Sequence, residues 1–168
     1  MQLDALSQCA ETFYREFSAI CGQHTPPKPR LRALIQGHQT LSDGIYQLGD
    51  DGAICRRQGQ FMATFEDAYN YNNFSFLHTS CVLFFAVDKQ AVKDDDGAAM
   101  CNLMLGSVCQ RLIEHFTQQG LFARPFRSYD QFEVDSLTLD EEQRAEEMTY
   151  FGLLIGKNRA MQSLGAIK

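Results

Sequence analysis

The second half of the sequence, residues 97–159, constrains the fold more than any other stretch. Apolar residues recur at every third or fourth position over residues 98–119, which predicts one long amphipathic helix. Gly120 is a natural residue to end that helix, because the position after a helix favours glycine. The acidic loop at residues 93–97 precedes the helix, where the helix dipole favours negative charge. The expected apolar stripe consists of Met100, Leu103, Met104, Val108, Leu112, Ile113 and Phe116.

Two continuous apolar runs are typical of strands that are buried between layers. Residues 80–88 contain Cys-Val-Leu-Phe-Phe-Ala-Val, and residues 149–155 contain Tyr-Phe-Gly-Leu-Leu-Ile. Side chains that are apolar on both sides of a strand indicate burial on both faces of a sheet. Residues 136–147 predict a second helix, which is acidic and mostly exposed.

The N-terminal half alternates helical and extended patterns. Residues 3–20 predict a first helix with one apolar face, and the prolines within residues 22–30 favour an extended connector. Residues 31–37 fit either a short strand or a helical turn. Alternating apolar residues on both sides of a Gly/Asp turn predict a β-hairpin over residues 44–56. Residues 60–70 are expected to be helical.

Interspersed helices and strands predict an α+β fold, in which helices pack against a sheet. The length of 168 residues fits a single domain, residues 1–168, with residues 1–30 as an N-terminal helix and proline-rich connector. A hydrophobic content of 45% and a charged content of 21% are those of an ordinary globular protein, so extensive disorder is not expected.

Charge and apolar patterning exclude several classes of function. A net charge of -6 argues against broad nucleic-acid binding, which needs a positive surface. The first ten residues lack the apolar run of a signal peptide, and the apolar run at residues 81–87 is too short to span a membrane. The six cysteines show no CxxC spacing, so we expect reduced cytoplasmic thiols and neither a disulfide framework nor a metal site.

No catalytic motif of high specificity is present in the sequence. The glycine-rich nucleotide motifs, the GxSxG nucleophile motif and the HExxH zinc motif are all missing. The four histidines, His24, His38, His78 and His115, are isolated from one another. Each is expected to be a surface or structural residue and not a catalytic base.

Three segments, in this order along the chain, carry a resemblance to a known family. Residues 44–54 read Gly-Ile-Tyr-Gln-Leu-Gly-Asp-Asp-Gly-Ala-Ile. They look like a hairpin of the nitroreductase-like flavoproteins, and in particular of their azoline oxidase branch, which forms thiazoles and oxazoles. Residues 97–120 and the following residues 121–130 are similar to the family's central dimerisation helix and flavin-facing loop. Residues 150–159 are similar to the closing strand, whose end approaches the flavin phosphate. The resemblance implies a mainly antiparallel sheet flanked by helices, with a long central helix.

The resemblance also implies a function, an FMN-dependent oxidoreductase that works as a homodimer or with a partner subunit, since the family's flavin lies between subunits. The implied substrate is a peptide- or carrier-bound heterocycle or another small organic molecule, and the hydride chemistry would belong to the flavin. The implied cofactor-binding residues are Arg124, Phe126, Arg127, Lys157 and Arg159. The substrate candidates, in the polar-aromatic loop at residues 69–74, are Tyr71 and Phe74.

Each of these candidates has a structural alternative. Lys157 and Arg159 fit a solvated strand end as well as a phosphate contact. Phe126 fits a core residue after a turn. Tyr71 and Phe74 fit a loop that packs on its own domain.

The sequence departs from the family's pattern at its N-terminus. Family members begin with an Arg-x-Ser-x-Arg segment that binds the FMN phosphate, whereas the first helix here has only Arg15, and Arg30 and Arg32 follow the connector. The loop that offers paired glycines in the family reads Arg-Pro-Phe-Arg at residues 124–127. Either the cofactor is held differently, or a partner supplies the missing part, or the chain is a non-catalytic scaffold or subunit of a larger biosynthetic assembly. An unrelated α+β binding or adaptor protein is the remaining alternative.

Overall fold

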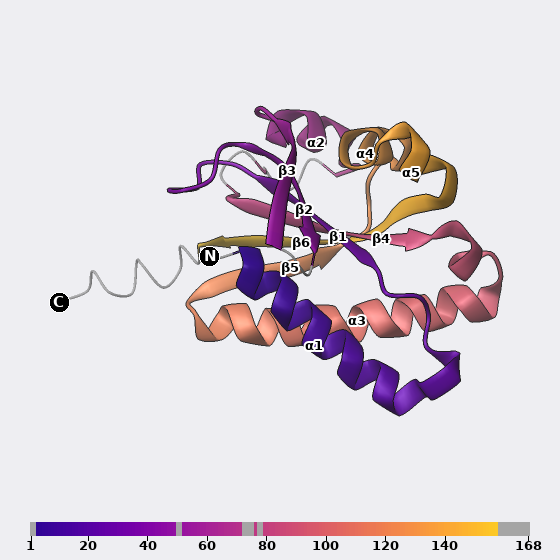
Figure 1. Cartoon of the computed structure of the whole chain (residues 1–168). Coiled ribbons are helices and arrows are strands. Elements are labelled where there is room, and N and C mark those ends of the chain that lie inside the picture. Colours follow the sequence, from indigo (N-terminus) through magenta and orange to yellow (C-terminus); the bar gives the residue numbers. More distant parts are fainter. Residues whose placement is uncertain (1–2, 50–51, 72–75, 77–78, 158–168) are drawn as a thin grey trace.

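A six-stranded antiparallel sheet runs through the middle of the protein, with helices on both of its faces (Figure 1). The computed structural model describes residues 3–49, 52–71, 76 and 79–157. The strand order is β3-β2-β1-β4-β6-β5, which confirms the expected α+β fold with an antiparallel sheet. The strands are β1 Arg30–Ile35, β2 Gly44–Gly49, β3 Gly52–Gln58, β4 Cys81–Asp88, β5 Leu121–Phe126 and β6 Glu147–Lys157.

Helices cover both faces of this sheet. The long helices α1 and α3 lie together on one face, and the short helices α2, α4 and α5 lie on the other (Figure 1). The α-helices are α1 Leu3–Cys21, α2 Met62–Ala68, α3 Asp95–Gln118, α4 Gln131–Thr138 and α5 Glu141–Glu146, and the one-turn helices are η1 Gly22–His24 and η2 Lys89–Val92. We call the two sides of the sheet the α1–α3 face and the α2–α4 face.

Each face of the sheet has its own apolar core, because successive side chains of a strand point to opposite sides. In β4, Leu83 and Phe85 pack toward α1 and α3, while Val82 and Phe84 pack toward α2 and α4. β4 is therefore buried on both faces, as its apolar run predicts. The segment after the proline-rich connector, for which a strand and a helical turn were both possible, forms the strand β1 between β2 and β4.

Helix α3 begins earlier than its apolar pattern predicts. Asp94 is the N-cap, and its Oδ1 accepts the backbone N–H of Gly97 at 2.8 Å, so that the last acids of the expected loop belong to the first helical turn. The expected stripe is wrong at Leu103, whose side chain is 59% exposed. Cys101 and Leu105 are buried against the sheet side of the helix instead. Gly120 follows the helix with a φ of 73°, as predicted.

Two segments differ from their predicted structure. Residues 121–130 do not form a loop throughout, because β5 is an edge strand that pairs with β6, and an edge strand tolerates Pro125. The single helix expected over residues 136–147 is wrong, since two short helices replace it. Asp130 caps α4, and Asp140 caps α5 in a reciprocal capping box with Gln143.

Two β-bulges place unpaired residues in the sheet. Arg56 is the extra residue of β3, because Ile45 pairs with Arg57 and Tyr46 pairs with Cys55. The bulge lets Arg56 and Arg57 reach the same face, where Arg56 binds Asp140 of the α5 cap at 3.2 Å. Arg57 donates to the carbonyl oxygens of Ser136 and Leu137 in α4 at 3.3 and 3.0 Å. Tyr150 is the extra residue of β6.

Candidate functional site

A pocket of about 300 Å³ opens at one end of the sheet, where strands β1 and β6 end and strands β4 and β5 begin. The antiparallel order of these strands brings their four termini together. Cys81, Ile155 and the half-buried Leu121 line the pocket with apolar groups. Its size is at the lower end of small-molecule sites, which are about 300–1,000 Å³.

The loop between β1 and β2, residues 36–43, forms one wall of this pocket. The carboxylate of Asp43 accepts the backbone N–H of Gly37 at 2.8 Å, so that the two ends of the loop are tied together. Gly37 has a φ of 63°, a conformation that favours glycine. The backbone N–H of Gln36 donates to the carbonyl oxygen of Ser80 at 3.2 Å, which fixes the wall to the start of β4.

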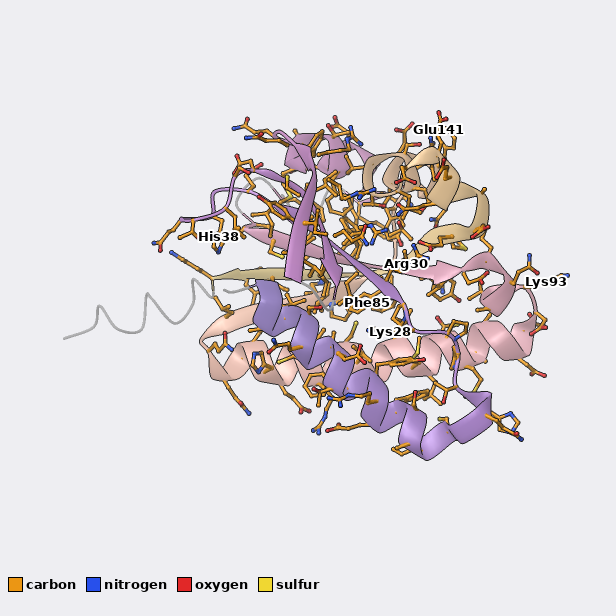
Figure 2. The ribbon with its side chains drawn as sticks, viewed as in Figure 1. Lys28, Arg30, His38, Phe85, Lys93 and Glu141 are labelled. Carbon is orange, nitrogen blue, oxygen red and sulfur yellow. The ribbon has the colours of Figure 1, made fainter. Side chains whose placement is uncertain are left out.

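His38 is half-buried on this wall and lies beside the end of β6 (Figure 2). The backbone N–H of Thr40 donates to His38 Nδ1 at 3.3 Å, and the Thr40 hydroxyl lies 3.4 Å from the same nitrogen. Because Nδ1 accepts this hydrogen bond, a neutral imidazole carries its proton on Nε2. The Nε2–H group is therefore a hydrogen-bond donor.

The pocket is basic although the protein is acidic. Lys157 lines it at the end of β6, and none of the described residues that line it is an aspartate or glutamate. Burial raises the pKa of the Cys81 thiol to about 12, so this group stays uncharged near neutral pH. An ammonium, an imidazole and the hydroxyls of Thr40 and Ser80 can all donate hydrogen bonds to an anion. The arrangement suits a small anionic group next to an apolar surface.

Two of the residues that the resemblance implies as cofactor ligands, Lys157 and Arg124, lie on opposite faces of the sheet. Leu153, Ile155 and Lys157 are alternate residues of β6, so their side chains lie on the same side of the strand, which is the α1–α3 face. Arg124 is exposed on the α2–α4 face, since it shares its side of β5 with Phe126. The two cations lie on the neighbouring strands β5 and β6 and point to opposite faces of the sheet.

Arg127 and Phe126 have partners within the protein. The Arg127 guanidinium lies 4.0 Å from the centre of the Tyr150 ring and donates to Oδ1 of Asn102 in α3 at 3.3 Å. The Phe126 ring is only 7% exposed and lies over Gly152 of β6. Phe126 therefore occupies the position of a core residue, which was one of its two expected roles.

The expected substrate residues lie only partly within the described part of the chain. Tyr71 is 56% exposed, and its ring packs edge-on against Tyr69 at a centroid distance of 6.1 Å. Phe74 and the expected cofactor residue Arg159 lie outside the described residues. Among the described residues, Tyr71 thus has one aromatic neighbour, and much of its surface is exposed.

A buried polar network holds β6 at its bulge. The backbone N–H of Thr149 donates to Oδ1 of Asp135 at 2.6 Å, and its carbonyl oxygen accepts from the Tyr129 hydroxyl and from Gln131 Nε2, both at 2.8 Å. These side chains come from α4 and the residues before it. They fix the position of the neighbouring Tyr150, on which Arg127 packs.

A second group of charges lies on the α2–α4 face. Glu147 Oε1 accepts from Arg30 Nε at 2.8 Å, and the Arg32 side chain is 1% exposed. Burial raises the pKa of Glu147 and lowers that of Arg32. Arg32 Nη2 has no hydrogen-bond partner among the described residues, while Nη1 donates to the carbonyl oxygen of Leu31 at 3.2 Å.

Three pocket residues, His38, Thr40 and Ser80, were not singled out as ligands from the sequence. They belong to two segments that come together only through the pairing of β1 with β4. The proximity of Gly37 and Asp43 in the sequence is a turn signal, but nothing in it indicates a pocket. In the described part of the chain, no three metal-binding side chains cluster, and no helix is long and apolar enough to cross a membrane.

No protein-family model and no curated protein matches the sequence. Solved structures match the fold. A candidate nitroreductase from Anabaena variabilis has a TM-score of 0.65 and 17% identity over 79% of this chain. A candidate nitroreductase from Ralstonia eutropha has a TM-score of 0.60 and 12% identity, also over 79%. A chain of the E. coli microcin synthetase McbBCD complex has a TM-score of 0.60 and 13% identity over 78%.

The matched region spans 27%, 60% and 52% of those three chains, respectively. The chain thus has a nitroreductase-like fold and covers only part of the length of these proteins. The similarity concerns the fold, because the identities are low.

Proposed function

We propose that this nitroreductase-like chain is a subunit of an FMN-dependent oxidoreductase, and that the flavin phosphate binds in the pocket at the end of β6. The observation that carries the proposal is the position of Lys157 beside a pocket without a described carboxylate. A flavin phosphate needs cations or N–H donors, and this pocket offers both. Arg159 follows Lys157 by two positions and is a further candidate for the phosphate.

The flavin site would need a second polypeptide. Lys157 and Arg124 lie on opposite faces of the sheet, so one chain cannot direct both toward one flavin. A second copy or a partner subunit would supply the remaining contacts. On α3, the exposed residues Leu103, Gly106 and Ser107 form a surface on which a second copy can pack.

The flavin, when bound, would supply hydride transfer. The residues of this chain would bind and orient the cofactor: Lys157 would neutralise phosphate charge, and Arg127 would stay near the ring system through its support by Tyr150. Tyr71 and Phe74 remain the proposed substrate contacts, and Phe126 would act through packing behind the site. The proposed substrate is a peptide- or carrier-bound heterocycle or another small organic molecule.

Flavin retention tests this proposal. The purified full chain, incubated with excess FMN and passed through a desalting column, should keep the flavin absorbance. Lys157→Ala should lose it, whereas Lys93→Ala should not, because Lys93 is exposed at the opposite end of the molecule (Figure 2). Protein that stays colourless after incubation would refute flavin binding by a homodimer of this chain. Reduction of bound flavin by NADH or NADPH, followed anaerobically, would then test for an oxidoreductase.

The second candidate function is a non-catalytic scaffold or a subunit of a larger biosynthetic assembly. It is favoured by the separation of Lys157 from Arg124 and by the fold match to a chain of a synthetase complex. In that case the purified chain should bind no flavin alone and should change mass on a sizing column only with a partner. Flavin binding by the chain alone would count against this candidate.

A further inference from the structure

We propose that His38 is a phosphate-binding residue, which acts with Lys157 on a phosphate monoester in the pocket at the end of β6. The inference rests on the proposed FMN function, in which that monoester is the flavin phosphate. It assigns a role to a loop that lies outside all the segments carrying the family resemblance. It also supplies a phosphate contact to a chain whose first helix has only one arginine.

The two proposed ligands approach the pocket from different elements. His38 lies on the β1–β2 loop, Lys157 ends β6, and both line the same pocket of about 300 Å³. Ser80, at the start of β4, lines the pocket as well. An anion in this pocket would therefore meet donors from three separate segments, which is the arrangement that encloses a tetrahedral group.

The loop is held in position without a ligand. Asp43 ties the loop through the N–H of Gly37, and Thr40 fixes the tautomer of His38 through Nδ1. The ring of His38 is therefore oriented before any anion binds. A ligand that meets an ordered loop loses less free energy to ordering than one that must fold it.

The charge of the pocket selects the class of ligand. A phosphate monoester carries nearly two negative charges near neutral pH. Lys157 supplies a positive charge, and no described pocket residue supplies a negative one. The one carboxylate of the loop, Asp43, accepts from Gly37 and from the Gln60 amide at 3.4 Å. The apolar groups of Cys81 and Ile155 cannot bind the anion, but they can contact the organic part of an ester.

The test compares FMN with riboflavin, which has the same ring system and lacks the phosphate. Dissociation constants of both are measured by fluorescence for the full chain. His38→Ala should weaken FMN binding about tenfold and leave riboflavin binding unchanged, as expected for one lost charge-assisted contact. His38→Gln keeps an acceptor for Thr40 and an N–H donor, so it should restore part of the affinity. The matched control is His24→Ala, because His24 is exposed in η1 and does not line the pocket.

A second measurement separates this inference from the flavin proposal. Inorganic phosphate is titrated into the isotopically labelled chain, and the NMR signals of His38 and of the backbone at Lys157 are followed. Chemical-shift changes on addition of phosphate, in a chain that does not bind FMN, would support the anion site and refute the FMN function. FMN binding that His38→Ala leaves unchanged would refute the role of His38 and leave the FMN function standing. If neither phosphate nor FMN has an effect, both proposals are wrong.

Discussion

Gly152 of β6 has no side chain, and the ring of Phe126 fills the space where one would be. A Cβ on Gly152 would lie 2.2 Å from Phe126 Cζ, whereas ordinary contact begins at 3.4 Å, so the ring would have to move by about 1 Å. The ring cannot move freely, because five aromatic rings surround it at centroid distances from 5.6 to 6.2 Å. These rings belong to Phe65, Tyr69, Phe76, Phe84 and Tyr129.

We therefore expect Gly152→Ala to destabilise the protein strongly. Overpacking of a well-filled core costs roughly 1–3 kcal/mol, and the rigid surroundings place this site near about 3 kcal/mol. For a chain of this length, that loss lowers Tm by roughly 6–12 °C. The assay is thermal and urea unfolding followed by circular dichroism. Gly49→Ala is the matched control, since nothing lies within 4 Å of a Cβ there.

A double substitution identifies the cause. Phe126→Leu removes the colliding ring. The double variant Gly152→Ala, Phe126→Leu should therefore lose less free energy of unfolding than the sum of the losses in the two single variants, by at least about 1 kcal/mol. A Gly152→Ala protein within about 0.5 kcal/mol of the original, or additive losses, would refute the reasoning. Either result would also indicate that the Phe126 ring can turn away from β6. Phe126 would then again be a candidate for direct contact with the flavin.

Three further outcomes follow from the structure. Asp135→Ala removes the acceptor of the buried Thr149 N–H, so urea unfolding should show a loss of about 2–3 kcal/mol, while the exposed Glu133→Ala should change little. Burial raises the pKa of Glu147 above its ordinary value of 4.5, so the folded protein binds this proton more tightly than the unfolded chain. The stabilisation that comes from this proton is fully present below pH 4.5 and is lost as the pH rises through the raised pKa. When the urea midpoint is plotted against pH, Glu147→Gln should flatten this part of the curve. A curve that Glu147→Gln leaves unchanged would contradict this expectation. Leu103→Arg, at an exposed site of α3, should leave Tm nearly unchanged but weaken a homodimer in analytical ultracentrifugation, and a wild-type chain that is monomeric at micromolar concentration would remove the dimer prediction.

The elements with strong periodic patterns could be predicted from the sequence. The burial of β4 is evident from its own apolar run, and the buried side of α3 is evident from its own apolar stripe, without knowledge of the rest of the chain. β5 was missed because Leu-Phe-Ala-Arg-Pro-Phe has a proline and an arginine, which are compatible with a strand only at a sheet edge. The separation of α4 from α5 depends on Asp140, which is the N-cap of α5, and the pattern of apolar residues does not show where a cap lies.

The candidate site was predictable only in part. Lys157 was found because its segment resembles a known strand end, and the structure places it beside a pocket. Residues 36–43 and Lys157 are far apart in the sequence. They lie close together in space only because β1 pairs with β4 and β4 pairs with β6, so the sequence gives no sign of their proximity. The opposite orientations of Arg124 and Lys157 depend on the register of β5 against β6, which no local pattern specifies.

The position of β6 has a consequence for synthesis on the ribosome. Although β6 follows β4 and β5 in the sequence, it lies between them in the sheet. Until residues 147–157 leave the exit tunnel, β4 has an unpaired edge and β5 has no neighbour in the sheet. An apolar strand with a free edge is a template for pairing with another chain, so we expect the nascent chain to be most prone to aggregation during this interval. A pause in translation at any point before residues 147–157 have left the tunnel would prolong the exposure of β4.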